Sequence, residues 1–318
     1  MKYYLGIDLG SVSTNLVVID EDGQVINEVY LRTKGQPIKA IQEGMKQLLE
    51  NLDSDIEISG VGTTGSGRHL AGIMVGADAV KNEITAHAIA ALHFEPDVRT
   101  VVEIGGQDSK IIIIRDGIVT DFAMNTVCAA GTGSFLDQQA NRIGIPIEHF
   151  GEYALRSKTP VRIAGRCAVF AESDMIHKQQ AGHNLEDIIR GLCEALVRNY
   201  MNNLARGKEI HPKVIFQGGV AANVGMKAAL EDALGCEVSV PEHFDVMGAV
   251  GAAFISEDEV QKKGKTNFRG FEISDTNFKV SNFECSGCPN RCEVVNFHME
   301  DKIIARWGDR CGRWKNIE

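Results

Sequence analysis

The chain has 318 residues, a length that predicts two domains with room for a small appendage, and its 44% hydrophobic content suffices for a large buried core. Its formal net charge is −10, and no basic run interrupts the sequence, which argues against nucleic acid as a partner. The N-terminus runs directly into a strand pattern without signal-peptide features, and no window approaches the roughly 20 apolar residues of a membrane span. We therefore expect a cytoplasmic protein without nucleic-acid or membrane partners.

The first group of elements spans residues 3–32 and predicts a three-strand meander. An apolar strand, a Gly/Ser turn and a second strand lead to Asp22-Gly23 and a third strand. Asp-Gly between β-rich runs predicts a hairpin, because both central residues of such a turn need positive φ. Residues 37–51 then predict an amphipathic helix with proline in its first turn. Its expected apolar face is Ile38, Ile41, Met45, Leu48 and Leu49.

The same order of elements returns at Thr100. Two strand patterns joined by a glycine-rich turn lead to Asp116-Gly117 and a third strand. A helix is expected from Phe135 onward, and a longer helix from its N-cap Asn184 to near Gly207. Two copies of one meander, each continued by helices, predict a duplicated α/β domain that binds its ligand in a cleft between the halves.

The sequence changes character after Phe254. Residues 255–282 are polar and rich in Lys, Glu and Asn, which predicts a linker with one short strand before a cysteine-rich tail. In a reducing compartment the eight cysteines are expected to bind metal, act in catalysis or lie in the core rather than form disulfides. Cys193, on the apolar stripe of the long predicted helix, and Cys236, before a strand, are expected to be core residues.

Four glycine-rich turns predict a phosphate-binding site. Glycine lets backbone N–H groups approach phosphate oxygens, and Ser or Thr hydroxyls add donors. Asp8 and Asp108 occupy equivalent places in the two repeats, where two carboxylates would hold Mg²⁺ through water and orient an attacking water. With Gln107 they are the candidate catalytic residues. The candidate nucleotide-binding residues are Gly10, Ser11, Ser13, Thr14, Gly105, Gly106, Gly131, Thr132, Gly133, Gly218, Gly219, Ala221 and Asn223.

The order of these turns distinguishes between nucleotide-binding classes. The chain has no G-x-x-x-x-G-K-[ST] sequence and no G-x-G-x-x-G after the first strand, which disfavours P-loop and dinucleotide-binding folds. The order resembles the superfamily of actin, sugar kinases and heat-shock chaperone ATPases. Residues 8–14 resemble its first phosphate loop, residues 105–109 its second, and residues 218–223 its adenosine motif.

Within that superfamily the chain resembles the activases of 2-hydroxyacyl-CoA dehydratases and the ATPase subunits of benzoyl-CoA reductases. The two segments most specific to this likeness are NTVCAAGTG at 125–133 and CAVFAES at 167–173. GTTGSGR at 62–68 and NEITAH at 82–87 are also similar to the family, and the likeness covers about residues 1–256.

The resemblance implies two ribonuclease-H-like domains of the actin type around a nucleotide cleft. Subdomain I would comprise residues 1–97, completed by a helix near 245–256. Subdomain II would comprise residues 98–244 and carry the cluster cysteines. Residues 257–318 would form the linker and the cysteine-rich tail.

Cys128 and Cys167 each precede a predicted helical segment, where a helix N-terminus stabilises a thiolate. Burial as small apolar residues is the alternative. The resemblance implies that the pair ligates one [4Fe–4S] cluster shared across a homodimer, since such a cluster takes four thiolates and a two-fold axis doubles each ligand. It also implies ATP hydrolysis, with ATP/ADP and Mg²⁺ bound, coupled to one-electron transfer in anaerobic metabolism. The partner would be a dehydratase or a related double-cluster reductase, and the donor ferredoxin or flavodoxin.

Four cysteines crowd the tail with metal-ligand spacing. They are Cys285, Cys288, Cys292 and Cys311. This density of thiols predicts a second metal site, for Zn²⁺ or a second iron–sulfur cluster, with metal-free surface thiols as the alternative. The tail departs from the short activases and resembles longer activase-type proteins, which leaves the partner open.

Two other functions fit the phosphate loops. A sugar kinase, such as an N-acetylglucosamine kinase, would use Asp108 as the base toward a hydroxyl. A chaperone-like module would use the nucleotide to gate a protein contact. The sugar-kinase interpretation does not account for the segments around Cys128 and Cys167.

Overall fold

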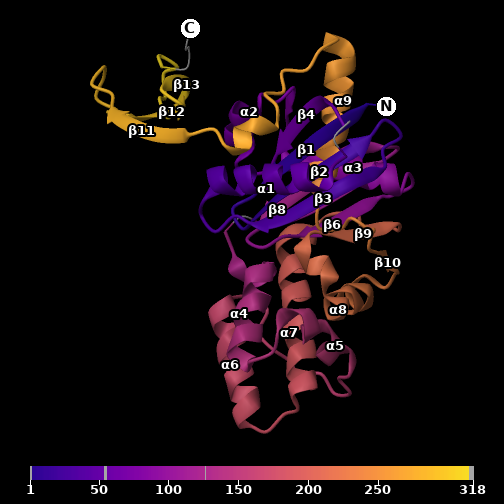
Figure 1. Cartoon of the computed structure of the whole chain (residues 1–318). Helices are drawn as coiled ribbons and strands as arrows, with labels where there is room; N and C mark the ends of the chain where they lie inside the picture. The colour runs from indigo at the N-terminus through magenta and orange to yellow at the C-terminus, as the bar shows by residue number, and fades with distance from the viewer. Residues whose placement is uncertain (1, 54–55, 126, 315–318) are drawn as a thin grey trace. The chain divides into compact units, whose positions relative to one another are not determined.

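Two β-sheets of matching topology organise the chain (Figure 1). The computed structural model describes residues 2–53, 56–125 and 127–314. It divides into unit 1, with residues 1–10, 14–81 and 252–318, and unit 2, with residues 11–13 and 82–251.

The sheet of unit 1 contains the first predicted meander. Its strands run in the order β3-β2-β1-β4-β5, with β1 antiparallel to β2 and parallel to β4. They are β1 (Tyr3–Leu9), β2 (Ser13–Asp20), β3 (Val25–Arg32), β4 (Ile58–Thr64) and β5 (Ala79–Val80). The accompanying helices are α1 (Pro37–Asn51), α2 (Arg68–Val75) and the greater part of α9 (Met247–Lys263).

Helix α1 confirms the helix predicted over residues 37–51, including proline in the first turn. Ile41, Met45 and Leu48 are fully buried against the sheet, as the apolar periodicity requires. Leu49 was placed on the same face, and this was wrong, because its side chain is 54% exposed.

The sheet of unit 2 repeats the pattern. Its order is β10-β9-β6-β7-β8, with β6 antiparallel to β7 and parallel to β9, so the predicted duplication is confirmed. The strands are β6 (Thr100–Ile104), β7 (Ser109–Arg115), β8 (Ile118–Asn125), β9 (Val214–Gln217) and β10 (Val238–Ser239). The helices are α3 (Glu83–Phe94), α4 (Gly133–Ile143), α5 (Ile147–Leu155), α6 (Ala168–Gln180), α7 (Leu185–Tyr200) and α8 (Val224–Leu234), with short 3₁₀ turns η1 (Ala129–Gly131) and η3 (Gly219–Ala222).

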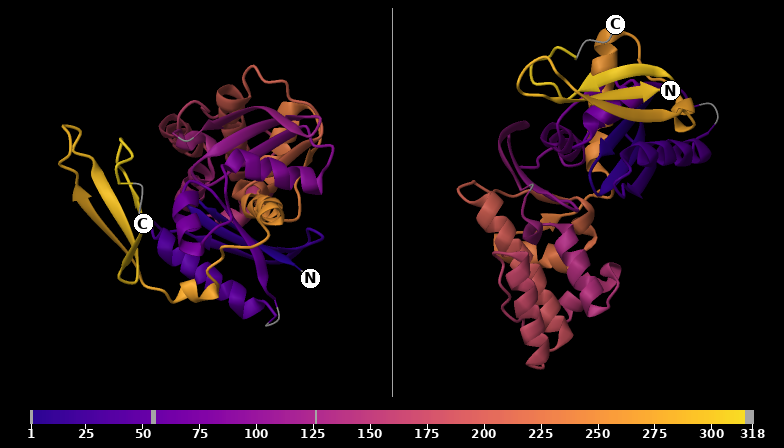
Figure 2. Two further views of the ribbon diagram at one scale, coloured as in Figure 1. Left: turned by 90° about the horizontal axis from the view of Figure 1, so that it is seen from above. Right: turned by 90° about the vertical axis from the view of Figure 1, so that its left-hand side faces the viewer.

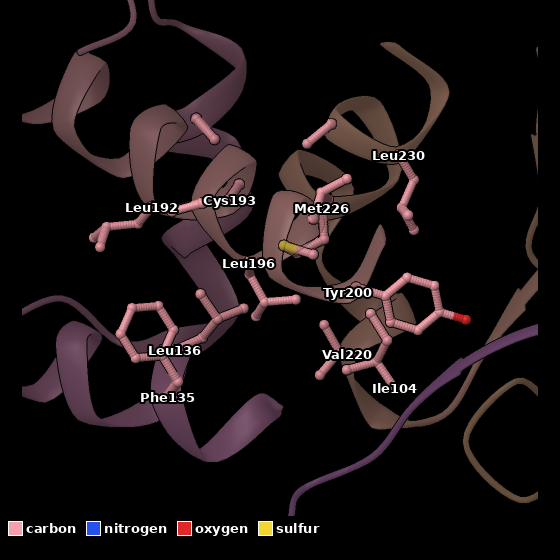
Figure 3. Packing of buried hydrophobic residues seen from close by; sticks show 14 of the residues in the cluster. Ile104, Phe135, Leu136, Leu192, Cys193, Leu196, Tyr200, Val220, Met226 and Leu230 are labelled. Atoms are coloured by element: carbon pink, nitrogen blue, oxygen red, sulfur yellow. The ribbon is translucent and has the colours of Figure 1, made fainter. Parts of the chain in front are cut away.

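Helix α7 lies at the centre of the unit 2 core. Leu192, Leu196 and Tyr200 pack between side chains of α4 and α8 (Figure 3). Cys193 is fully buried in this cluster, which confirms it as a core residue, and burial raises the pKa of its thiol to about 12. Cys236 is half-buried against the same core. After Tyr200 the helix continues as a π-helical turn, η2 (Met201–Ala205), so the helical stretch expected to end near Gly207 stops close to that point.

The tail differs from the expected linker. Helix α9 continues to Lys263, beyond the predicted end near residue 256, because Ile255 and Ser256 are buried and Glu259 pairs with Lys263 one turn later. After η4 (Phe271–Ser274) follow β11 (Phe278–Glu284), β12 (Glu293–Met299) and β13 (Lys302–Trp307). These three strands form their own antiparallel sheet, yellow in Figure 2.

The tail is held to the N-terminal part of unit 1 by both apolar and polar contacts. Ile273 and Phe297 are buried in the unit 1 core. Gln42 of α1 donates from Nε2 to the carbonyl of Thr276 at 2.8 Å, and Lys46 pairs with Asp275 at 2.8 Å. Across the residues that the structure describes, no helix has both the length and the apolar character needed to cross a bilayer.

Candidate functional site

The turn after β1 is supported by side chains from two other segments. Thr14 is fully buried, and its hydroxyl bonds that of Thr33 at 2.8 Å, which in turn donates to the carbonyl of Gly10 at 2.9 Å. The Thr14 hydroxyl therefore fixes the turn. On the other side, a Cβ at Gly65 would lie 2.4 Å from Oδ1 of the half-buried Asp8, so only glycine allows this approach. Ser13, also a predicted phosphate contact, begins β2.

The second glycine turn joins β6 to β7. Gly105 N–H donates to the carbonyl of Asp108 at 3.0 Å, which closes the turn. Ser11 donates from Oγ to Oε1 of Gln107 at 2.7 Å, so two predicted site residues from different repeats are brought together within unit 2. A Cβ at Gly106 would lie 2.7 Å from the side chain of Val12.

A buried ion network lies directly beneath this turn. Lys110 Nζ is 2.8 Å from Oε2 of Glu103 and 2.8 Å from Oδ2 of Asp108. Burial opposes the charge of Lys110, but the two carboxylates outweigh it and raise the pKa of the ammonium. Asp108 was a predicted site residue and its partners Glu103 and Lys110 were not, although charged residues inside two apolar strands were a signal of buried pairing.

The glycine turn after β9 approaches the same network. Gly218 has a φ of +86°, and a Cβ there would lie 2.7 Å from Oε1 of Glu103. The preceding residue, Gln217, bonds Nδ1 of the buried His87 at 2.7 Å. Burial and then the nearby Lys110 lower the pKa of His87 to about 3, so this imidazole is neutral at physiological pH.

The predicted adenosine motif forms the start of α8. Gly219 and Ala221 lie in η3, and Ala221 N–H donates to the carbonyl of Gly218 at 2.9 Å. Asn223 caps α8 by accepting from the N–H of Met226 at 3.1 Å. Its Nδ2 is buried and has no hydrogen-bond partner among the described residues.

The Cys128 turn is held by Asn125, the last residue of β8. The Asn125 side chain accepts from Cys128 N–H at 2.9 Å and donates to Cys128 O at 2.8 Å. Cys128 then caps η1, and buried Thr132 donates from Oγ1 to the carbonyl of Ala129 at 2.8 Å. Thr126, in the same motif, lies outside the described residues.

The Cys128 turn is bonded directly to the second phosphate turn. Gly133 N–H donates to Gly105 O at 2.9 Å, and Ser134 N–H donates to Gly106 O at 2.8 Å. The Ser134 hydroxyl also donates to the Gly106 carbonyl, which makes three hydrogen bonds between the two turns. A displacement of the Gly105–Gly106 backbone is therefore transmitted to the residues that follow Cys128.

Asn199 connects the two cysteine segments. Cys167 is the N-cap of α6, as predicted, and Asn199 Nδ2 donates to Gly165 O, two residues before it, at 2.6 Å. Its Oδ1 lies 2.8 Å from where a Cβ on Gly131 would stand. Asn199 is 3% exposed and lies two residues before the π-helical turn, a feature often found at functional sites. The sequence reasoning missed it, although an Asn among the apolar residues of a buried helix was a signal.

Both cysteines have exposed apolar neighbours. Cys128 and Cys167 are half-buried free thiols. Val127 is 93% exposed, and Val169 and Phe170 are 68% and 62% exposed. Exposed apolar groups clustered around one feature are typical of an interaction surface.

A basic hollow lies beside the Cys167 segment, although no basic run marks it in the sequence, because its arginines come from two separate segments. It encloses about 530 Å³ and is lined by Arg162, Gly165, Arg166, Arg198, Asn199, Asn202, Asn203 and Arg206. Within the described part of the chain, Arg162, Arg166 and Arg206 form no ion pair. Burial, and repulsion from Arg162, lower the pKa of Arg198.

The tail cysteines differ in exposure. Cys285 is buried, Cys292 is half-buried, and Cys288 and Cys311 are exposed. Hydrogen bonds from the Trp314 indole and from the Gly287 N–H lower the pKa of the Cys285 thiol. No three His, Cys, Asp or Glu side chains among the described residues already stand close enough to hold a metal ion, so the tail site stays a prediction.

Two α/β units with sheets of matching topology, each with a glycine-rich turn after its first strand, define an ATPase of the actin-like class. The chain belongs to the BadF/BadG/BcrA/BcrD ATPase family, whose model matches residues 5–256.

Its relatives agree in both sequence and structure. The chain is 36% identical to the (R)-2-hydroxyglutaryl-CoA dehydratase activating ATPase of Acidaminococcus fermentans, over 82% of this chain and 99% of that protein. The crystal structure of component A of that dehydratase superposes with a TM-score of 0.76 at 33% identity, covering 82% of this chain and all of that one. The activator of 2-hydroxyisocaproyl-CoA dehydratase from Clostridium difficile, with bound ADPNP, also gives 0.76 at 29% identity, covering 82% of this chain and 97% of that one.

Proposed function

We propose that this chain is an ATP-driven activator that passes single electrons from a [4Fe–4S] cluster, shared by two copies of the chain, to a partner enzyme. The relatives named as activators of 2-hydroxyacyl-CoA dehydratases support a partner of that class, or a related double-cluster reductase. In this proposal Asp8, Gln107 and Asp108 act on the nucleotide with Mg²⁺, and the glycine turns bind its phosphates.

Cys128 and Cys167 are the residues that would hold the cluster. Their thiols fit it, because both are half-buried and so remain accessible, with Cys128 at the start of η1 and Cys167 at the start of α6. One chain supplies two of the four thiolates that a cluster takes, so a two-fold axis through the site completes the set. The exposed side chains of Val127 and Phe170 supply apolar area for the contact between the copies. When bound, the cluster supplies one-electron redox chemistry.

The observation that carries the proposal is the hydrogen bonding of Gly133 and Ser134 to the carbonyls of Gly105 and Gly106. These bonds link the turn proposed to bind phosphate to the turn that bears Cys128. Asn199 extends the connection to the Cys167 segment. A change in the nucleotide that moves residues 105–106 would therefore reach the Cys128 turn through these hydrogen bonds and the Cys167 segment through the Asn199 side chain.

The basic hollow is the proposed docking face for the partner. Its unpaired arginines lie beside the Cys167 segment in a protein of net charge −10, so a carboxylate-rich partner surface would meet complementary charge where an electron leaves.

The test is replacement of each cysteine. Cys128→Ala and Cys167→Ala are expected to abolish the brown chromophore and the bound iron after anaerobic purification, while ADP binding stays within about twofold of the wild type. The matched control is Cys236→Ala, a half-buried thiol of the same unit, which should keep both properties. Full iron content in either cluster-site variant would refute the proposal.

A further inference from the structure

Three of the four tail cysteines lie on one hairpin turn. Strands β11 and β12 pair up to Glu284 and Glu293, and the turn between them contains Cys285, Cys288 and Cys292. Cys285 N–H donates to Cys292 O at 2.8 Å, which extends the ladder by one pair and brings these two residues opposite each other.

The fourth cysteine returns to the same end of the sheet. After β13, the ring of Trp314 packs edge-on against Phe283 of β11, with 5.0 Å between ring centroids. The indole Nε1–H of Trp314 donates to Sγ of Cys285 at 3.3 Å. Cys311 lies within this returning segment, so it is carried back toward the hairpin turn.

Asp309 supplies a second, independent sign of a ligand. Its side chain is 8% exposed, and Oδ2 accepts from Trp314 N–H at 3.1 Å and lies 3.8 Å from Sγ of Cys311. Oδ1 is buried without a hydrogen-bond partner in the part of the chain that the structure describes. A buried carboxylate oxygen left without a donor or cation is costly, so the position of this carboxylate beside the Cys311 thiol points to a cation at this place.

The tail sheet has little core of its own. Val294 and Phe297 of β12 are fully buried, whereas the residues of β11 are half-buried or exposed. Phe297 packs into the unit 1 core, but the hairpin turn and the returning segment have few buried apolar side chains, and small structures of that kind usually need a disulfide or a metal to hold them. Four thiolates are the ligands of structural zinc, whose binding contributes directly to folding free energy.

We propose that Cys285, Cys288, Cys292 and Cys311 bind one structural Zn²⁺ that fastens the returning segment to the hairpin turn. The Trp314 indole N–H would stabilise the Cys285 thiolate as an outer-shell donor. Because the four thiols are not yet assembled, binding must draw residues 285–292 and 309–314 together and release thiol protons. The site lies outside the matched family region, residues 5–256, and does not depend on the proposed electron transfer.

The test uses the full-length chain carrying Cys128→Ala and Cys167→Ala, so that iron at the proposed cluster site does not interfere. Metal-free protein is titrated with Zn²⁺, and with Co²⁺ as a spectroscopic substitute. We expect one equivalent of either ion per chain and thiolate-to-cobalt charge-transfer absorption. The two tryptophans of the protein are Trp307 and Trp314, so a zinc-dependent change in tryptophan emission reports on the tail alone.

The variants are Cys288→Ser and Cys311→Ser in that background, with Cys236→Ser as the matched thiol control. We expect the first two to lose zinc affinity at least 100-fold and the control to retain it, while ADP binding shows that the remainder of each variant is folded. Unchanged zinc stoichiometry in Cys288→Ser and Cys311→Ser would overturn the proposal. Iron bound at the tail as a cluster, with no zinc uptake, would overturn the assignment to zinc.

Discussion

The side-chain amide of Asn199 donates a 2.6 Å hydrogen bond to the carbonyl of Gly165. This bond anchors the segment leading to Cys167 on α7, while Oδ1 of the same amide accepts from Asn203 Nδ2 at 3.0 Å and lies close enough to Gly131, in the turn that follows Cys128, to leave no room for a side chain there. One buried side chain therefore lies against two thiol-bearing segments that are well separated in the sequence.

Asn199→Asp tests this link with little change in volume. The carboxylate has no N–H to give to Gly165 and is buried, so we expect the free energy of unfolding to fall by about 1–3 kcal/mol. We also expect a chelator to remove iron at least tenfold faster than from the wild type. Asn202→Asp, at an exposed position on the rim of the same hollow, is the control. Equal iron loss in the two variants would show that Asn199 does not position the cysteines.

Gly133→Ala tests the contact between the cysteine turn and the phosphate turn. The added methyl would lie 3.1 Å from Gly105 O and 2.9 Å from Cγ2 of Val220, so the backbone at residue 105 must shift. We expect ADP affinity to fall about tenfold, measured by titration calorimetry. Ser134→Ala removes one hydrogen bond to Gly106 and adds no atom, so its loss should be fivefold or less.

Regular elements could be predicted because their signals are local. The Asp-Gly turns and the apolar face of residues 37–51 specify the strands and the helix without help from distant residues. The Lys110 network and the basic hollow could not be predicted this way. Lys110 meets Glu103 only when β6 and β7 pair, and Arg166 meets Arg198 only when the segment before α6 packs against α7.

His87 gives the protein a pH-dependent stability term. Its pKa is about 3 in the folded state and ordinarily 6.5, so between these values the unfolded state binds the proton and the folded state does not. The free energy of unfolding should therefore fall as the pH decreases from about 6.5 toward 3, by up to roughly 1.4 kcal/mol per pH unit from this group.

His87→Gln can still bond Gln217 but has no imidazole to protonate. The free energy of unfolding of this variant, measured by urea unfolding at several pH values between pH 4 and pH 7, should therefore fall less steeply with decreasing pH than that of the wild type. His69→Gln is the control, because it makes the same substitution at an exposed position. A parallel pair of curves for the wild type and His87→Gln would contradict the assignment.

Arg166→Glu tests the docking face. Arg166 is exposed, unpaired among the described residues and next to Cys167, so charge reversal should weaken binding of a carboxylate-rich partner at least tenfold. The measurement is partner affinity at several salt concentrations, and the variant should show a smaller salt dependence. Lys265→Glu makes the same charge change at an exposed site in unit 1 and should have little effect. If both variants bind with the same affinity, the partner docks elsewhere.

Phe170→Asp tests the contact between two copies of the chain. Phe170 is 62% exposed three residues after Cys167, so an aspartate there costs the single chain little but puts an unpaired charge into the proposed interface. We expect sedimentation to show a shift from dimer to monomer, and iron to be lost with it, because each monomer retains two of the four thiolates. Ile118→Asp, at a residue 67% exposed on β8, should leave both unchanged. A dimeric Phe170→Asp protein with full iron would mean that the copies meet through a different surface.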